Sequence, residues 1–268
     1  MAWTERLVVR DGVRLVCRDW GGNRPAIVLL HGLAGHAGEW DALAEQLTSA
    51  YRVVAVDQRG HGASERLPQD VSRAAFVADV VAVTDQLSLV RPVLIGQSLG
   101  GHTAILTAAR RPEAVRALVI IEAGAGDPDP DGPARIGRWL DSWPVPFPSR
   151  DAAVQFFGGG AVGVAWADGL EERGGRWWPR FDRDVMVRCL MDNAQRSFAQ
   201  EWDRIGCPTL LVLAQSSFLA PSEVDDLLRR RPLTTSVSVP GTHHDLHVQQ
   251  PGIVHDLISP FLAGLAKE

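Results

Sequence analysis

Short strand-like runs recur along the chain and alternate with segments of helical spacing. Most of these runs are continuously apolar, which is typical of strands that are covered on both faces of a sheet. They occupy residues 26–30, 52–56, 92–95, 117–121, 208–214 and 235–239. Before them, residues 6–10 and 13–19 alternate apolar and polar side chains around Asp11-Gly12, which predicts a β-hairpin with one solvent-exposed face.

Helical spacing fills the intervals between the runs. It is clearest at residues 72–88, where Phe76, Val80 and Val83 share one face and Ser72 is a candidate N-cap. Further helices are expected at about residues 37–49, 222–231 and 251–265. This alternation predicts an α/β fold with a mostly parallel central sheet, helices on both faces and right-handed crossovers. A functional site is then expected outside the carboxyl ends of the strands.

The composition changes between residues 124 and 205. Gly, Pro and Asp are frequent in residues 124–148, and the runs at 158–160 and 174–175 are pure glycine. Six of the nine tryptophans lie in this part of the chain, at Trp139, Trp143, Trp166, Trp177, Trp178 and Trp202. We therefore divide the chain into a core of residues 1–123 and 206–268 and a separate tryptophan-rich segment of residues 124–205.

Composition and charge exclude several classes of function. The chain has 268 residues, 46% of them hydrophobic and 22% charged, which is ordinary for a globular protein with one large core. A net charge of −5 gives no attraction to nucleic acid or to an anionic membrane. The three cysteines, Cys17, Cys189 and Cys207, lack metal-ligand spacing and are expected to be reduced thiols. We expect a cytoplasmic protein without a signal peptide, membrane span, metal or cofactor, and with a small molecule as its partner.

The candidate chemistry centres on the motif Gly96-Gln97-Ser98-Leu99-Gly100-Gly101, which stands between a predicted strand and a predicted helix. In this context the motif is typical of a nucleophile on a sharp turn, where glycines keep neighbouring elements clear of the serine. Ser98 is therefore the candidate nucleophile. An ordinary N-cap serine is the alternative, but it explains neither the flanking glycines nor the turn.

Four motifs in this order resemble those of the α/β-hydrolase-fold superfamily over essentially the whole chain. They are HGLAG at residues 31–35, DQRGHGAS at 57–64, GQSLGG at 96–101 and HHDLHVQQP at 243–251. The resemblance implies an α/β-hydrolase fold and a helical cap inserted after the sixth strand, where residues 124–205 fit. It also implies that the backbone N–H groups of Leu33 and Leu99 form the oxyanion hole.

The resemblance selects His244 as the general base, with His243 as the second candidate. His247 and His255 lie nearby. The loop that carries the acid in most relatives is residues 214–220 here, and it has no carboxylate; Ser217 stands about where the aspartate is expected. Some relatives use a carboxylate after the sixth strand, and Glu122 occupies that position.

Other residues near these motifs have alternative interpretations. Asp127 is a weaker candidate for the acid, and Asp225 and Asp226 are expected on an exposed helix face. Asp57, Arg59 and His61 are expected to form a structural turn network rather than to take part in catalysis. We expect His36, Trp40 and Trp143 to line an apolar or aromatic substrate pocket.

These features predict a serine hydrolase of the carboxylesterase type. It would cleave a carboxylic ester or a related acyl bond (thioester, lactone or amide) of a small apolar or aromatic molecule through an acyl-enzyme. The alternative is a non-hydrolytic or ligand-binding protein, isomerase-like or epimerase-like, that keeps the fold but has a degraded triad. The missing loop aspartate favours this alternative, and the intact serine turn opposes it.

Overall fold

The computed structural model describes residues 2–265 and has a central sheet of eight strands in the order β1-β2-β4-β3-β5-β6-β9-β10. The strands are β1 (Thr4–Arg10), β2 (Val13–Asp19), β3 (Ala26–Leu30), β4 (Arg52–Val56), β5 (Val93–Gln97), β6 (Ala117–Ile121), β9 (Thr209–Ala214) and β10 (Thr235–Val239). The pairs β1–β2 and β2–β4 are antiparallel and the remaining pairs are parallel. This architecture is the α/β-hydrolase fold that the motifs predicted.

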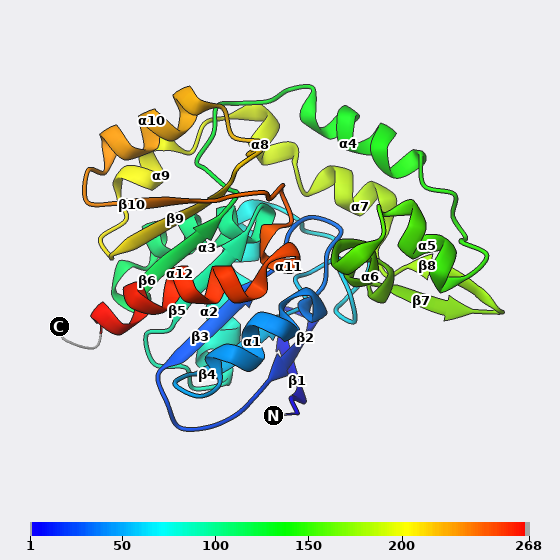
Figure 1. The fold of residues 1–268 in the computed structure, drawn as a ribbon, viewed down its shortest axis with the longest axis horizontal. Coiled ribbons are helices and arrows are strands. Elements are labelled where there is room, and N and C mark those ends of the chain that lie inside the picture. Colours follow the sequence, from blue (N-terminus) through cyan, green and yellow to red (C-terminus); the bar gives the residue numbers. More distant parts are fainter. Residues whose placement is uncertain (1, 266–268) are drawn as a thin grey trace.

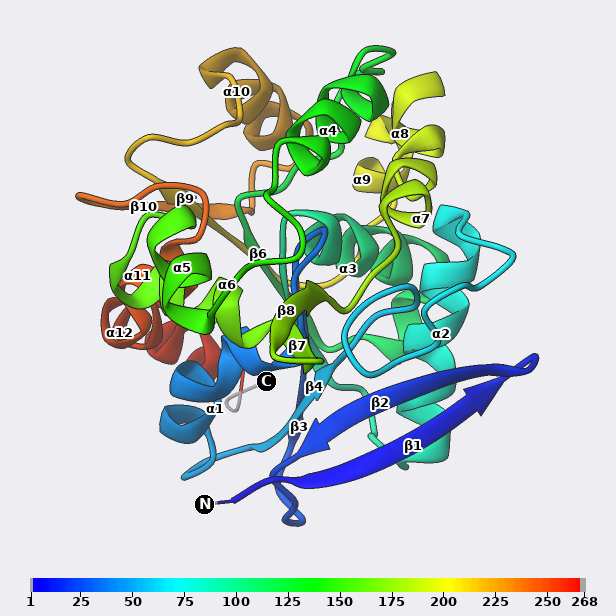
Figure 2. The ribbon, with the colours of Figure 1, turned by 90° about the vertical axis from the view of Figure 1, so that its right-hand side faces the viewer.

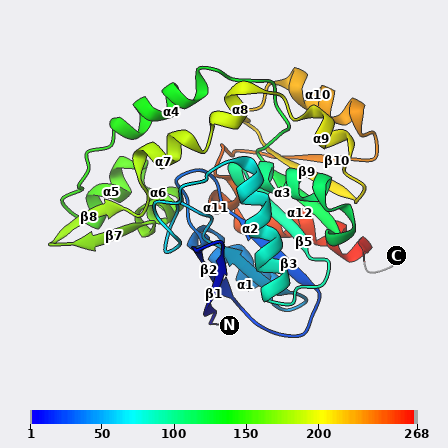
Figure 3. The same ribbon diagram turned by 180° about the vertical axis from the view of Figure 1, so that it is seen from behind.

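Helices cover both faces of the sheet, as Figures 1 and 3 show from opposite sides. One face carries α1 (Asp41–Leu47), α11 (Leu246–Gln249) and α12 (Pro251–Gly264), and the other carries α2 (Arg73–Gln86), α3 (Leu99–Arg110), α9 (Ala199–Asp203) and α10 (Pro221–Arg230). Alternate strand residues divide between the two apolar clusters. Val28 and Leu30 of β3, for example, pack toward α2 and α3, whereas Ile27 and Leu29 pack toward α1 and α12.

Local sequence signals explain how the first elements begin. The hairpin turn has positive φ at Asp11 and Gly12, 50° and 79°, the backbone conformation that a two-residue type I′ turn requires. Ser72 caps α2, because its side chain accepts a hydrogen bond from the Ala75 N–H at 3.2 Å. Both predictions are confirmed.

The segment after β6 forms a subdomain to one side of the sheet (Figures 1 and 2). It contains α4 (Gly132–Asp141), α5 (Arg150–Phe156), α6 (Gly160–Asp168), β7 (Leu170–Arg173), β8 (Arg176–Pro179), α7 (Arg183–Arg188) and α8 (Met191–Gln195). The segment therefore contains a two-stranded hairpin, β7–β8, in addition to the helices that were expected. Trp143, Phe147 and Phe181 belong to an apolar cluster that the subdomain shares with core residues, among them Phe76 and Leu99. Helix α9, by contrast, packs on α3, and its Trp202 belongs to the apolar cluster between the sheet and helices α2 and α3.

Among the described residues, no helix has both the length and the apolar character that crossing a membrane requires.

Candidate active site

Ser98 occupies the turn between β5 and α3 with φ 51° and ψ −118°, a positive-φ conformation that is strained for a non-glycine residue. The neighbouring glycines make this turn possible. A Cβ atom at Gly96 would overlap the carbonyl oxygen of Gly100, and a Cβ at Gly100 would overlap that of Leu30. The steric role expected of these glycines is thus visible in the structure, and Ser98 lines a cavity.

Two backbone N–H groups lie at the cavity beside Ser98. Leu99 is the first residue of α3, so its N–H has no partner in a preceding helical turn. Leu33 follows the end of β3. Both residues line the cavity with Ser98, and within residues 2–265 neither N–H donates a hydrogen bond to the protein. Both N–H groups are therefore free to donate to a bound group, as an oxyanion hole requires.

A buried histidine holds one of these donors in place. The Gln58 N–H donates to Nε2 of His31 at 3.0 Å, so the ring proton is on Nδ1, which donates to the Gly32 carbonyl at 2.7 Å. That carbonyl belongs to the same peptide group as the Leu33 N–H. The sequence places His31 at a strand end but does not reveal this role, which depends on a contact with Gln58 after the neighbouring strand.

His244 lies beside Glu122 on the wall of the same cavity. The separation between His244 Nδ1 and Glu122 Oε2 is 3.6 Å, slightly longer than a hydrogen bond, as catalytic pairs often are before substrate binds. The ring of Phe218 packs edge-on against the imidazole, with centroids 4.9 Å apart. Gln97, next to Ser98, donates to the His244 carbonyl at 3.1 Å and so connects the base-bearing loop to the serine turn.

Glu122 is fully buried directly after β6 and has a positive φ of 48°. Its Oε1 accepts the Ala214 N–H at 2.7 Å, and its Oε2 accepts the Phe218 N–H at 3.2 Å. Burial alone would raise the pKa of this carboxyl. The His244 imidazole, the two backbone N–H groups and the Ser217 hydroxyl outweigh burial and hold the pKa below its ordinary value of 4.5. Glu122 is therefore an anion at neutral pH.

The loop after β9 thus contributes hydrogen-bond donors to Glu122 rather than a carboxylate of its own. Ser217, which stands where the aspartate is expected, has its hydroxyl near enough to Glu122 to help lower the pKa of that carboxyl, and its Oγ accepts the Leu219 N–H at 3.1 Å. Asp127 lines the cavity without contacting His244. Asp225 is exposed, and Asp226 pairs with Arg229 and Arg230 on α10.

The other candidate bases lie elsewhere. His243 is exposed and faces a separate pocket, and its N–H bonds to Gln249. His247 is buried against Trp40, with its Nε2 3.7 Å from Glu39. His255 pairs with Asp256 on α12. Of the four histidines, His244 is the one that shares the cavity wall with Ser98.

The cavity has a volume of about 970 Å³ and extends between the sheet and the inserted subdomain. Trp139 and Trp166 supply its aromatic wall. The structure places the three side chains expected there elsewhere. His36 is buried, with Nε2 2.9 Å from the Ala165 carbonyl; Trp40 is fully buried beneath α1; and Trp143 lies inside the aromatic cluster of the subdomain. The sequence shows where these side chains stand along the chain, but it does not show whether each one faces the cavity or the interior of the protein.

A hydrogen bond joins the subdomain to the base-bearing loop. The Trp166 indole Nε1–H donates to Oδ2 of Asp245, directly after His244, at 3.1 Å. Both residues line the cavity. The position of α6 and that of the candidate base are therefore coupled.

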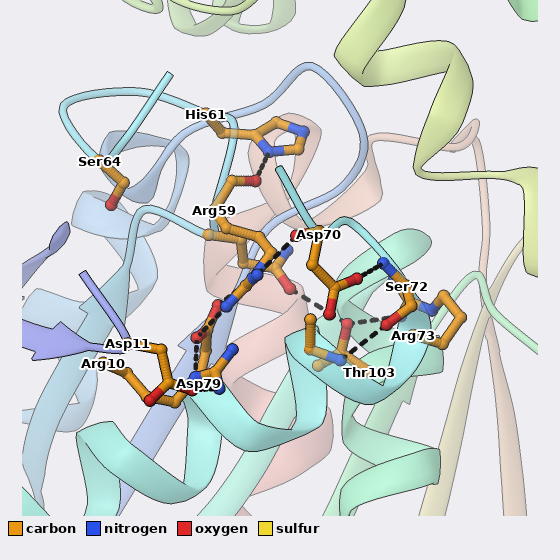
Figure 4. Close-up of polar contacts among 12 residues, drawn as sticks. Arg10, Asp11, Arg59, His61, Ser64, Asp70, Ser72, Arg73, Asp79 and Thr103 are labelled. Atoms are coloured by element: carbon orange, nitrogen blue, oxygen red, sulfur yellow. Dashed lines mark hydrogen bonds and ion pairs between the residues drawn. The ribbon is translucent and has the colours of Figure 1, made fainter. Parts of the chain in front are cut away.

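The polar turn after β4 has the structural role that its composition suggested. Asp57 accepts the backbone N–H groups of Ala37 and Ala63, at 2.6 and 2.9 Å. Arg59 pairs not with Asp57 but with Asp79 of α2, through two hydrogen bonds of 2.5 and 2.6 Å (Figure 4). His61 Nδ1 bonds to the Arg59 carbonyl. These contacts attach the turn to α2.

Within residues 2–265, His, Cys, Asp and Glu side chains form no group of three or more that could hold a metal ion.

Comparison with known proteins agrees with the observed fold. The model of the "Alpha/beta hydrolase family" matches residues 27–257. The chain is 30% identical over 263 residues to the "sn-1-specific diacylglycerol lipase ABHD11" of Mus musculus, which covers 91% of this chain and 83% of the relative. The solved structure of "E-2-(Acetamidomethylene)succinate Hydrolase" superposes with a TM-score of 0.89 at 22% identity, covering 97% of this chain and 99% of the other. The "enol-lactonase from Burkholderia xenovorans LB400" gives 0.80 at 19% identity, covering 96% and 100%.

Proposed function

The chain belongs to the alpha/beta hydrolase family, and on that premise we propose that it is a serine hydrolase of the carboxylesterase type. Its substrate is a small molecule with an apolar or aromatic part and a carboxylic ester or related acyl bond. The hydrolase names of its relatives support hydrolytic activity in general. The observation that carries the finer proposal is the buried, ionised Glu122 beside His244, which lines the same cavity as the strained Ser98.

In the proposed mechanism, His244 takes the proton of the Ser98 hydroxyl as Oγ attacks the substrate carbonyl. Glu122 orients the imidazole and stabilises its positive charge. The backbone N–H groups of Leu33 and Leu99 stabilise the oxyanion of the tetrahedral intermediate. His244 then protonates the leaving group, and a water molecule, activated by the same imidazole, releases the acid from Ser98.

The cavity supports a substrate of moderate size. Its aromatic wall at Trp139 and Trp166 suits apolar surface, and a volume of about 970 Å³ suits a small molecule. Its wall also contains polar and charged residues, among them Asp127, Glu223 and Arg196. A substrate that is apolar in one part and polar in another therefore fits this cavity.

The test is labelling of the purified protein with a fluorophosphonate, which reacts with an activated serine. We expect stoichiometric labelling that is lost in Ser98→Ala and kept in Ser216→Ala, an exposed serine of the neighbouring loop. Because the 3.6 Å separation leaves the His244–Glu122 hydrogen bond unformed in this state, a non-hydrolytic or binding protein is the second candidate. Intact fold without labelling would favour that candidate.

A further inference from the structure

His36 is a buried histidine that the proposed mechanism does not use, and it ends the loop of residues 31–36 that carries the oxyanion donor Leu33. Its side chain caps the short 3-10 helix that follows, because Nδ1 accepts the Gly38 N–H at 3.1 Å. The proton of the ring is therefore on Nε2. This N–H donates to the Ala165 carbonyl of α6 at 2.9 Å. One imidazole thus joins the oxyanion loop, residues 31–36, to the inserted subdomain.

Helix α6 receives this contact at its C-terminal end. Ala165 is in the last turn, where carbonyl groups have no partner within the helix, so the His36 N–H satisfies one of them. Gly169, the C-cap residue, lets the ring come close, because a Cβ atom there would lie only 2.9 Å from His36 Cδ2. Its backbone has φ −70° and ψ −13°, a conformation that any residue adopts. The close approach of the imidazole therefore gives a reason for glycine at this position.

The next residue of α6 makes the corresponding contact to the loop that carries the base. The Trp166 indole N–H donates to Oδ2 of Asp245, which directly follows His244, at 3.1 Å. Two consecutive residues of one helix, Ala165 and Trp166, therefore bond to the oxyanion loop and to the base-bearing loop. A displacement of α6 would change the position of both loops.

A direct polar contact between the segments that follow these two loops is looser. Nε2 of His247, two residues after Asp245, lies 3.7 Å from Oε2 of Glu39, which is beyond hydrogen-bond distance. Neither ring nitrogen of His247 has a hydrogen-bond partner among the described residues. Glu39 itself accepts the backbone N–H of His36 at 3.3 Å. The two hydrogen bonds made by α6, at 2.9 and 3.1 Å, are both shorter than this direct contact.

We propose that α6 fixes the positions of the oxyanion hole and of the base relative to each other, and that His36 is a positioning residue for the reaction. The inference rests on the proposed function, because α6 acts on Leu33 and His244 through their loops. A catalytic group displaced by about 1 Å can cost on the order of 10²-fold in rate, so hydrogen bonds that hold both loops affect turnover without touching the substrate.

Two substitutions at His36 separate its bond to α6 from its role as a cap. In His36→Asn the short side chain can still accept the Gly38 N–H, as asparagine does at many N-caps, but it does not reach Ala165. In His36→Gln the longer amide stands near the place of Nε2 and can still donate to Ala165, while the cap is lost. Each variant loses one hydrogen bond, so both should unfold about 2–4 °C below wild type.

Turnover of short p-nitrophenyl esters distinguishes the two variants. His36→Asn should lower kcat about fivefold to tenfold and leave KM within about twofold of wild type, the effect of losing one hydrogen bond that acts on position alone. His36→Gln should keep kcat within about twofold. Gly169→Ala, whose methyl group meets the imidazole, should act like His36→Asn, and Gly252→Ala, where a Cβ atom has no neighbour within 4 Å, should act like wild type. Equal kcat values for His36→Asn and His36→Gln would overturn the proposal.

A double variant tests whether the two contacts act through one helix. Trp166→Phe removes the hydrogen bond between α6 and the base-bearing loop. Once one contact is broken, α6 no longer joins the two loops, so the loss of the second contact adds little. Combining His36→Asn with Trp166→Phe should therefore lower kcat by no more than about twofold beyond the larger single effect. Losses that multiply would mean that the contacts act independently, and would overturn the proposal.

Hydrogen exchange of the full chain separates this proposal from the mechanism. His36→Asn should increase amide exchange in residues 243–249, and Trp166→Phe should increase it in residues 31–36, because each substitution loosens the loop at the far side of α6. His36→Gln should leave exchange in residues 243–249 unchanged. If fluorophosphonate labelling fails while these reciprocal changes occur, the acyl-enzyme is wrong and the positioning role of α6 stands. If labelling succeeds and neither loop responds to the distant substitution, that role is wrong and the proposed function stands.

Discussion

Oε2 of Glu122 faces Nδ1 of His244 at 3.6 Å, and the carboxylate reaches this position from the end of β6 rather than from the loop after β9. The loop instead holds the carboxylate with the Phe218 N–H, and its Ser217 hydroxyl helps to lower the pKa of Glu122. The arrangement has the parts of an acid–histidine pair, with the acid delivered by a central strand. It also gives the Glu122 carboxylate a rigid support, because β6 is fully buried.

Glu122→Gln should lower the turnover of short p-nitrophenyl esters by up to about 10⁴-fold, the loss that follows when the partner of a catalytic histidine becomes an amide. The amide keeps the size of the side chain but cannot stabilise the imidazolium. Steady-state kinetics give the measurement. Asp225→Asn, an exposed change of the same kind, is the control and should act as wild type. Unchanged turnover in Glu122→Gln would remove this residue from the triad.

The same carboxylate makes stability depend on acid pH. The pKa of Glu122 in the folded protein is below its ordinary value of 4.5, so the ionised form contributes stability above pH 4.5 that is lost as the pH falls through the folded-state value. Urea unfolding should show wild type more stable than Glu122→Gln by on the order of 2 kcal/mol at pH 7. The gap should narrow progressively below pH 4.5. A constant gap across this range would contradict the assignment.

Gly96→Ala and Gly100→Ala should each abolish fluorophosphonate labelling of Ser98 and destabilise the fold. In both cases the new methyl group meets a backbone carbonyl that has no room to move. Gly252→Ala is the matched control. It lies in α12, where a Cβ atom would have no neighbour within 4 Å, so alanine should raise stability by up to about 1 kcal/mol. Fluorophosphonate labelling and thermal unfolding are measured on each variant. Normal labelling of Gly100→Ala would show that the serine turn accommodates a methyl group, contrary to this prediction.

Trp166→Phe should remove the hydrogen bond to Asp245 while keeping most of the aromatic wall. We expect kcat/KM to fall by about threefold to tenfold, the value of one neutral-to-charged hydrogen bond that helps to position a catalytic loop. Trp178→Phe, in β8 and outside the cavity wall, is the control. Equal effects of the two substitutions would mean that the hydrogen bond does not position His244.

Asp79→Asn should destabilise the protein by about 3–5 kcal/mol, because it leaves the buried Arg59 guanidinium without its anion. Asp226→Asn breaks an exposed pair on α10 and should cost less than about 1 kcal/mol. Urea unfolding at neutral pH distinguishes the two. A similarly small loss of unfolding free energy in both variants would show that the Arg59–Asp79 ion pair contributes little to stability.

The fold can be predicted in outline because its signals are local. The Asp11-Gly12 turn, the apolar runs and the Ser72 cap each depend on a few adjacent residues, and the structure confirms them. The hairpin β7–β8 escapes prediction because its strands are four residues long and carry several charged side chains. Its Gly174-Gly175 turn has the composition of any break between helices, so nothing nearby marks it as a hairpin.

Parts of the site can be predicted for the same reason, and others cannot. The motifs place Ser98 and Leu99 at a strand end, and the structure brings His244 to the same cavity, with Glu122 buried behind it. The pocket residues depend on how the subdomain sits on the core, which is why the expectation for His36, Trp40 and Trp143 is wrong. Contacts such as that between Arg73 and His102 join distant elements, and no sequence spacing indicates them.

The two candidate oxyanion donors belong to the main chain, so the Leu33 and Leu99 side chains take no part in stabilising charge. Both residues nevertheless line the cavity that contains Ser98 and shape the space around it. A substitution at either position can therefore change which molecules the cavity accepts without removing either main-chain donor. Evolution can retune substrate choice here by point substitution, without first rebuilding the catalytic apparatus.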